Sequence, residues 1–260
     1  MIIDRKRDYH MHTIFSDGVA QIDEMVSAAI NEGLEAITIT DHMPLPFENR
    51  YAMHADDIQK YRHEIELAQR KYASQITIKM GLEFEYLEPF KQWVHSIADM
   101  GWDHLLASVH SLIINHRPYL VNGTESEFNI LVERFDHNIE KLCKRYFETV
   151  QMAAQSGLFD IVSHLDVLKK HNMDERYFSE TFPWYRAMVI KTLDIIRETG
   201  MKMEINMAGF NHPVGKQYPS KWIIQEAVKR NIPFVLGSDS HKPESLGQNF
   251  YKCDALALNT

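Results

Sequence analysis

The chain has 260 residues, of which 45% are hydrophobic and 25% charged, a globular composition that excludes wholesale disorder. Its 28 basic and 36 acidic side chains give a net charge of −8, which argues against nonspecific binding to nucleic acid or anionic lipid. Two cysteines are too few for a disulfide scaffold. We expect a cytoplasmic protein, because no run approaches the ~18 apolar residues of a membrane span and the first residues are charged.

Short apolar runs alternate with longer amphipathic stretches along the chain. Strands are predicted at residues 8–13, 35–41, 76–84, 104–111, 160–165, 201–207 and 233–238. Helices are predicted near residues 22–32, 55–72, 90–100, 126–155, 184–199 and 220–230. This alternation indicates parallel strands with crossover helices, in either an open doubly wound sheet or a closed βα barrel. Because no linker or repeat divides the sequence, we expect one domain over residues 1–260.

Most of the predicted strands carry an imidazole or a carboxylate at the C-terminal end. These residues are His10, His12, His42, Glu83, His110, His164, Asp239 and His241. In a βα barrel such ends converge on one face, where these enzymes build their sites, whereas an open sheet would spread them along an edge. His10 and His12 are two residues apart, so their side chains point to the same side of a strand, and Asp239 and His241 repeat this spacing. The pattern therefore favours a closed or nearly closed barrel.

The donor types in this set predict a metal centre. Imidazole and carboxylate without thiolate suit zinc, iron or manganese. Asp17, in the loop after the first strand, brings the candidate ligands to nine, whereas a mononuclear catalytic site typically needs about three plus water. Two or three divalent ions fit better, with Glu83 as the predicted bridging carboxylate. Asp41 is expected to orient an imidazole, with a turn role as the alternative.

The strand ends resemble the motifs of the polymerase and histidinol phosphatase (PHP) family over about residues 8–242. The matching motifs are His10-Met11-His12-Thr13, Ser16-Asp17-Gly18, Thr40-Asp41-His42, Gly81-Leu82-Glu83, Ser108-Val109-His110, Ser163-His164 and Gly237-Ser238-Asp239-Ser240-His241. Within the family, the chain is most similar to the histidinol-phosphate phosphatases. The resemblance implies an α/β fold, a distorted (β/α)7 TIM-like barrel with a trinuclear centre at the C-terminal ends of its strands.

The resemblance also implies how the ligands are shared among the metals. One metal would take His10, His12, Glu83 and Asp239, a second would share Glu83 with His110 and His164, and a third would take Asp17, His42 and His241. Some family members carry histidine in the loop where this chain has Asp17. A centre with only two metals therefore stays open as an alternative.

The resemblance implies hydrolysis of the small-molecule phosphomonoester L-histidinol phosphate, by attack of a metal-bridging hydroxide, in histidine biosynthesis. Glu83, Asp239 and His241 are the predicted catalytic residues, and Arg117 and Asn206 are predicted to contact substrate. Two alternatives are a nucleotide phosphatase or nuclease of the same family and a non-catalytic metal-binding domain. No nucleic-acid or membrane partner is expected, and the sequence does not define the oligomeric state.

Overall fold

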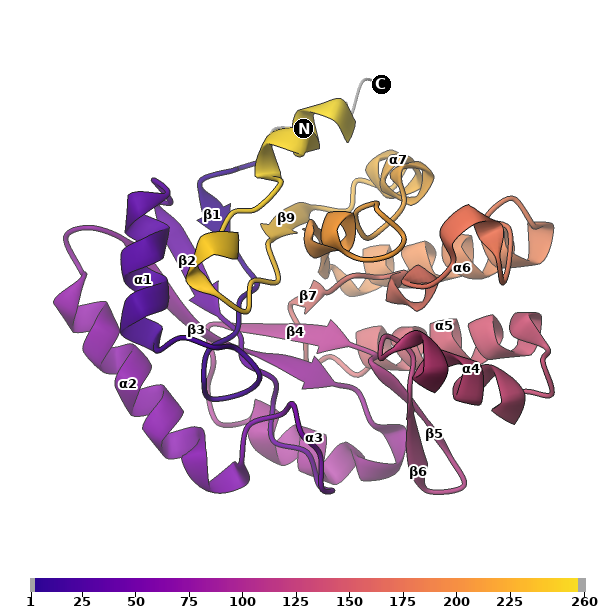
Figure 1. Cartoon of the computed structure of the whole chain (residues 1–260), viewed down its shortest axis with the longest axis horizontal. Helices are drawn as coiled ribbons and strands as arrows, with labels where there is room; N and C mark the ends of the chain where they lie inside the picture. The colour runs from indigo at the N-terminus through magenta and orange to yellow at the C-terminus, as the bar shows by residue number, and fades with distance from the viewer. Residues whose placement is uncertain (1–2, 257–260) are drawn as a thin grey trace.

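The computed structural model describes residues 3–256, and its centre is a seven-stranded parallel sheet in the order β1-β2-β3-β4-β7-β8-β9. Its strands are β1 (Arg7–Asp8), β2 (Ala36–Ile39), β3 (Thr77–Glu85), β4 (His104–Ser108), β7 (Ile161–Val162), β8 (Lys202–Asn206) and β9 (Phe234–Gly237). Every neighbouring pair is parallel, so the C-terminal ends of all strands point the same way. Figure 1 shows the helices around the outside of these strands.

Backbone contacts between the first and last strands close the sheet into a barrel. The Tyr9 amide donates a hydrogen bond of 2.9 Å to the carbonyl of Leu236. Beyond it, Met11 and Ser240 form a parallel β-bridge. The predicted distorted (β/α)7 barrel is therefore confirmed.

Seven α-helices occur in the described part of the chain. They are α1 (Ile22–Asn31), α2 (Ile58–Lys71), α3 (Lys91–Ala98), α4 (Glu125–Arg134), α5 (Ile139–Gln155), α6 (Pro183–Thr199) and α7 (Lys221–Lys229). Each buries one apolar stripe; in α5, for example, the buried Leu142, Tyr146 and Val150 recur every four residues. None of the helices in residues 3–256 has the length and apolarity needed to span a bilayer.

A packed apolar layer inside the barrel supports the polar strand ends. Leu106 of β4, Ile161 of β7 and Val235 of β9 are buried and form one cluster. Side chains two residues apart on a strand share a face, so Leu106 lies beneath Ser108, whose hydroxyl donates to the Glu83 carboxylate at 2.6 Å. Polar side chains above this layer are thus held by a close-packed floor.

The strands predicted at 8–13 and 160–165 are shorter in the structure, where β1 and β7 have two residues each. Two other regions differ more. The helix predicted at 126–155 is two helices, because Asp136 and His137 have φ values of 53° and 59° and Asn138 caps the N-terminus of α5. The strand predicted at 104–111 ends at Ser108, and an unpredicted antiparallel hairpin follows, formed by β5 (Ser111–Ile114) and β6 (Arg117–Leu120). This hairpin projects from the barrel rim (Figure 1).

Candidate metal centre

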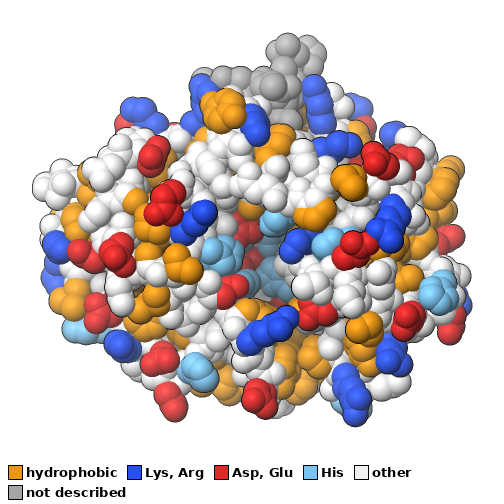
Figure 2. Space-filling view, viewed as in Figure 1, with side chains coloured by type: hydrophobic (Ala, Val, Ile, Leu, Met, Phe, Trp, Pro, Cys, Tyr) orange, Lys and Arg blue, Asp and Glu red, His pale blue; other side chains and the backbone are white. Residues whose placement is uncertain are grey.

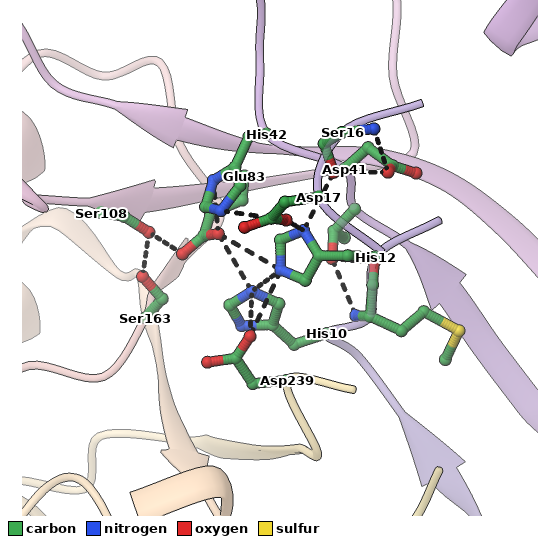
Figure 3. Close-up of polar contacts among 12 residues, drawn as sticks. His10, His12, Ser16, Asp17, Asp41, His42, Glu83, Ser108, Ser163 and Asp239 are labelled. Carbon is green, nitrogen blue, oxygen red and sulfur yellow. Dashed lines mark hydrogen bonds and ion pairs between the residues drawn. The ribbon is translucent and has the colours of Figure 1, made fainter. Parts of the chain in front are cut away.

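The nine predicted ligands come together at the C-terminal ends of the strands. Three overlapping groups could each hold a metal ion: His12, Asp17, His42 and His241; His10, His12 and Glu83; and His42, Glu83 and His110. Within each group the ligand atoms lie within 4.8 Å of one another. Figure 3 shows His10, His12 and His42 around Glu83, with Asp17 and Asp239 beside them. The barrel thus joins residues that are up to 231 positions apart in the chain (His10 and His241).

Glu83 occupies the middle of this arrangement. One of its oxygens, Oε2, lies 3.0 Å from His42 Nδ1 and 3.3 Å from His10 Nε2. The other, Oε1, lies 2.8 Å from His164 Nε2 and 3.1 Å from His110 Nε2. The two oxygens of a single buried carboxylate therefore face two different imidazole sets, which is the geometry that a bridging ligand needs.

Two aspartates complete the groups from opposite sides. Asp239 Oδ1 lies 3.3 Å from His12 Nε2. Asp17 Oδ1 lies 3.2 Å from His241 Nε2 and 3.8 Å from His42 Nε2. Asp239 has a φ of 53°, a left-handed conformation that aspartate tolerates better than most residues. The chain bends at this position directly after β9.

Two further carboxylates orient the histidines from behind. His10 Nδ1 lies 2.8 Å from Glu204 Oε1, and His110 Nδ1 lies 2.8 Å from Glu85 Oε2. Each carboxylate accepts the Nδ1 proton, so Nε2 is the nitrogen that can coordinate a metal ion once it has lost its own proton, the arrangement typical of metal-binding histidines. The sequence analysis missed both roles, although Glu85 is two residues after Glu83 and therefore shares its face of β3.

The donor set fits divalent metal ions. His10 Nε2 and His12 Nε2 approach to 3.1 Å, as do the Nε2 atoms of His110 and His164. Two imidazole nitrogens at that distance need a proton or a cation between them. Because carboxylates hold the Nδ1 protons of His10 and His110, the lone pairs of these residues point into the shared space, where a borderline cation such as zinc would bind.

Burial and neighbouring charges together determine which side chains of the centre are ionised. Burial disfavours the charged form of Glu83, but the surrounding histidines outweigh burial and hold its pKa well below the usual value. Burial, with the positive charges of His241 and His42, lowers the pKa of His12 to about 3. His12 is therefore neutral at physiological pH and ready to act as a ligand, while Glu83 is ionised.

A cavity of about 360 Å³ opens above the ligands. Its wall includes Tyr51, Lys170 and His212. Burial, and then the charge of Lys170, lowers the pKa of His212 to about 4, so this imidazole is neutral. Figure 2 shows histidine and acidic side chains at the bottom of a hollow whose rim carries basic side chains. Basic side chains thus lie at the rim of the hollow, and candidate metal-ligand atoms lie at its bottom.

A family model described as the PHP domain matches residues 8–208 of the chain. The chain belongs to the PHP family. A relative from Deinococcus radiodurans, named "Probable histidinol-phosphatase", is 30% identical to this PHP chain. The alignment covers 94% of this chain and 89% of the relative. The histidinol-phosphatase of Bacillus subtilis is 28% identical, over 94% of this chain and 96% of the relative. The resemblance deduced from the motifs is thereby confirmed.

Solved structures agree with the PHP fold. A candidate histidinol phosphatase from Listeria monocytogenes has a TM-score of 0.85 at 23% identity, covering 95% of this chain and 99% of the other. The histidinol phosphate phosphatase of Lactococcus lactis, solved with zinc, L-histidinol and phosphate, has a TM-score of 0.75 at 24% identity, covering 98% and 95%. At these identities the likeness shows the fold alone.

Two predicted substrate contacts lie beside the PHP cavity rather than in its lining. Arg117 is exposed at the start of β6 and belongs to the hairpin. Asn206 is fully buried at the end of β8, where its side-chain amide donates to Glu204 and, at 3.1 Å, to Asp239 Oδ2. The substrate-binding roles of Arg117 and Asn206 stay predictions, and the contacts of Asn206 hold the Asp239 carboxylate in place.

Asp41 does not orient an imidazole as expected. Its carboxylate accepts hydrogen bonds from the Thr13 backbone and hydroxyl, both at 2.8 Å, and from the Ser16 hydroxyl at 2.6 Å. The buried Asp41 therefore fixes the loop after β1, which carries Asp17 into the centre. This is the turn role that the sequence left as the alternative.

Proposed function

We propose that this PHP protein is a metal-dependent phosphatase that hydrolyses L-histidinol phosphate to L-histidinol and phosphate. The observation that carries the proposal is the convergence of nine imidazole and carboxylate side chains beneath a cavity that also presents Lys170. Relatives that bear the histidinol-phosphatase name align with nearly the whole chain, which supports this choice of substrate.

The proposal assigns each of the nine ligands to a metal ion. We infer that His10, His12, Glu83 and Asp239 hold one divalent ion. Glu83 also serves a second ion with His110 and His164, and Asp17, His42 and His241 hold a third. When bound, such ions activate water for attack and neutralise phosphoryl charge. Zinc, iron and manganese all suit these donors.

The chain itself supplies the surroundings of the phosphoryl group. Lys170 Nζ is held at 2.6 Å from the carbonyl of Asn122 at the cavity wall. Burial lowers the pKa of Lys170, while the charge of Asp239 opposes this shift. A phosphate dianion placed above the ligands would favour the charged form of Lys170 and pair with it. Neutral His212, whose Nδ1 lies 3.1 Å from the Tyr218 hydroxyl, lines the same wall.

A phosphate-release screen tests the proposal directly. The purified protein, supplied with zinc, iron(II) or manganese(II), is assayed against L-histidinol phosphate, sugar phosphates, mononucleotides and single-stranded DNA. We expect the highest kcat/KM for L-histidinol phosphate, and chelation should abolish turnover. A higher kcat/KM for nucleotides or cleavage of DNA would replace the proposal with the family's nucleotide phosphatase or nuclease activity.

Three statements about the whole protein also stay predictions. We propose a cytoplasmic location, because the substrate belongs to amino-acid biosynthesis. The net charge of −8 supports the expectation that long nucleic acids and membranes are not partners. We further propose that residues 1–260 act as one domain.

A further inference from the structure

A second cavity adjoins the proposed metal centre. It has a volume of about 380 Å³ and is lined largely by apolar and aromatic side chains, among them Phe47, Pro118, Tyr119 and Ile130. It shares Arg50, Tyr51, Leu120 and Glu127 with the cavity above the ligands. The two spaces therefore border each other. A phosphomonoester bound with its phosphate over the ligands can extend its alcohol portion into the second cavity.

Glu127 is the acidic residue common to both cavities, and its environment keeps it ionised. The Thr124 amide and hydroxyl both donate to Oε2 at 2.8 Å, in the capping box that begins α4. The hydrogen bond from the Thr124 amide is the main reason that the pKa of Glu127 lies below its usual value. The carboxylate is thus fixed in position and negatively charged at the boundary between the cavities.

The second oxygen of Glu127 pairs with an exposed arginine that a ligand can displace. Oε1 accepts one hydrogen bond, from Arg50 Nη2 at 3.0 Å, and the Arg50 side chain is 79% exposed. An exposed ion pair of this kind contributes only about 0–1 kcal/mol. A cation brought in by a ligand can therefore replace Arg50 on Oε1 without disturbing the capping box on Oε2.

We propose that Glu127 is the specificity-determining residue that selects phosphomonoesters whose alcohol carries an ammonium group close to the phosphate. This inference rests on the proposed function, since L-histidinol phosphate carries such an ammonium and an imidazole on its alcohol. Oε1 of Glu127 pairs with the ammonium, and the aromatic walls of the second cavity, Tyr51 and Tyr119, pack against the ring. Arg50, released from Glu127, stays at the cavity rim.

Glu127→Gln isolates the charge of this residue. Glutamine retains the capping box, because its amide oxygen can accept from Thr124, but it removes the negative charge. Glu125→Gln is the matched control: Glu125 lies in the same helical turn, pairs with Arg176, and lines neither cavity. Gly123→Ala is an independent variant, since a Cβ there would lie 2.6 Å from Glu127 Oε2 and would displace the carboxylate without changing its charge.

The readout is a substrate pair that differs in one group: L-histidinol phosphate and the same ester without its amino group, imidazolylpropyl phosphate. We expect wild type and Glu125→Gln to prefer the amine-bearing ester. In Glu127→Gln this preference, measured as a ratio of kcat/KM values, should fall about 10- to 100-fold, mainly through KM. Gly123→Ala should reduce it in the same direction, and thermal unfolding should stay cooperative in every variant.

The outcomes separate this inference from the proposed function. A wild-type preference that survives in Glu127→Gln would overturn the role of Glu127 while leaving the phosphatase intact. Equal kcat/KM values of wild type for both esters would show that the enzyme does not select substrates by their ammonium group. If wild type hydrolyses neither ester with any metal, the proposed function fails, and the inference about its specificity fails with it.

Discussion

The proposed bridging role of Glu83 depends on the two equivalent oxygens of its carboxylate. Oε1 faces His110 and His164, and Oε2 faces His10 and His42. In Glu83→Gln one oxygen becomes an NH2 group, which cannot coordinate a cation. We expect kcat to fall at least about 10²-fold, equivalent to ~2.7 kcal/mol in the barrier. Steady-state kinetics with metal analysis measures this effect.

A control variant separates this loss from damage to the fold. His54→Gln changes an exposed histidine that precedes a short 3-10 helix and lines neither cavity. Its kcat should match wild type, and both variants should unfold cooperatively. Full metal content and wild-type kcat in Glu83→Gln would show that Glu83 is not the bridge.

Protons compete with metal ions at the same residues. Burial disfavours charge on His241, but the hydrogen bond to Asp17 and the charge of Asp239 outweigh it and raise the pKa to about 9. Metal-free His241 therefore holds its proton at pH 7, and a metal ion must displace it. We expect metal binding to release protons at pH 7 and to weaken as the pH falls from about 9.

Calorimetric metal titration in buffers of different ionisation enthalpy measures this release. The apparent binding enthalpy should depend on the buffer at pH 7, and less so above pH 9, where His241 has already lost its proton. An enthalpy that is the same in every buffer at pH 7 would show that binding displaces no proton.

At the scale of elements, two segments compete for the phosphate-binding role. The sequence favours Arg117 of the hairpin, whereas the structure adds Lys170, which directly follows the 3-10 helix Val167–Lys169 and lines the cavity. Lys170→Met should lower kcat/KM by about 10- to 100-fold, as expected for loss of a charged hydrogen bond. Arg117→Ala should have the smaller effect. The reverse order in steady-state kinetics would return the role to the hairpin.

The packing of β9 against β8 requires a glycine. A Cβ on Gly237 would overlap Glu204 Oε1 and lie 2.8 Å from His10 Cβ. Gly237→Ala should therefore displace the carboxylate that orients His10. We expect a loss of about 1–3 kcal/mol in the free energy of unfolding and about 10- to 100-fold weaker metal binding.

Denaturant unfolding of the metal-free protein and metal titration measure these two effects of Gly237→Ala separately. Ala107→Gly, on strand β4, is the control for a change between glycine and alanine in a barrel strand, because the Ala107 side chain is not one of the proposed ligands. It should weaken the fold without a comparable loss of metal affinity. Wild-type metal affinity in Gly237→Ala would show that Glu204 does not need its present position.

At the scale of the whole molecule, the sequence predicted those ligands whose positions follow from the regular geometry of parallel strands. His10, His12, Glu83 and the other strand-end ligands were found because parallel strands place their C-terminal ends on one face. The supporting carboxylates were missed, because which imidazole Glu204 meets depends on the register between β1, β8 and β9. The contact of β1 with β9 joins Tyr9 to Leu236, 227 residues apart, and no local pattern encodes it.

The other differences from the predictions lie at a helix start, in a turn and at a helix break. Glu127 and Lys170 reach the cavities from segments whose paths are set by local hydrogen bonds, such as the Thr124 capping box and the contact of Lys170 with Asn122. The break between α4 and α5 depends on left-handed conformations at Asp136 and His137. Such conformations occur mostly in a few residue types, aspartate and histidine among them, but these types adopt them only in certain contexts.

The central claim is that converging ligands make this barrel a polynuclear metal-dependent phosphatase. The most direct test is stepwise reconstitution of the metal-free protein with zinc or manganese, with bound metal per chain and phosphate release from L-histidinol phosphate measured at each step. Activity should appear only as more than one ion binds per chain, and it should reach its maximum at two or three. Full activity with one ion per chain, or with none, would contradict the claim.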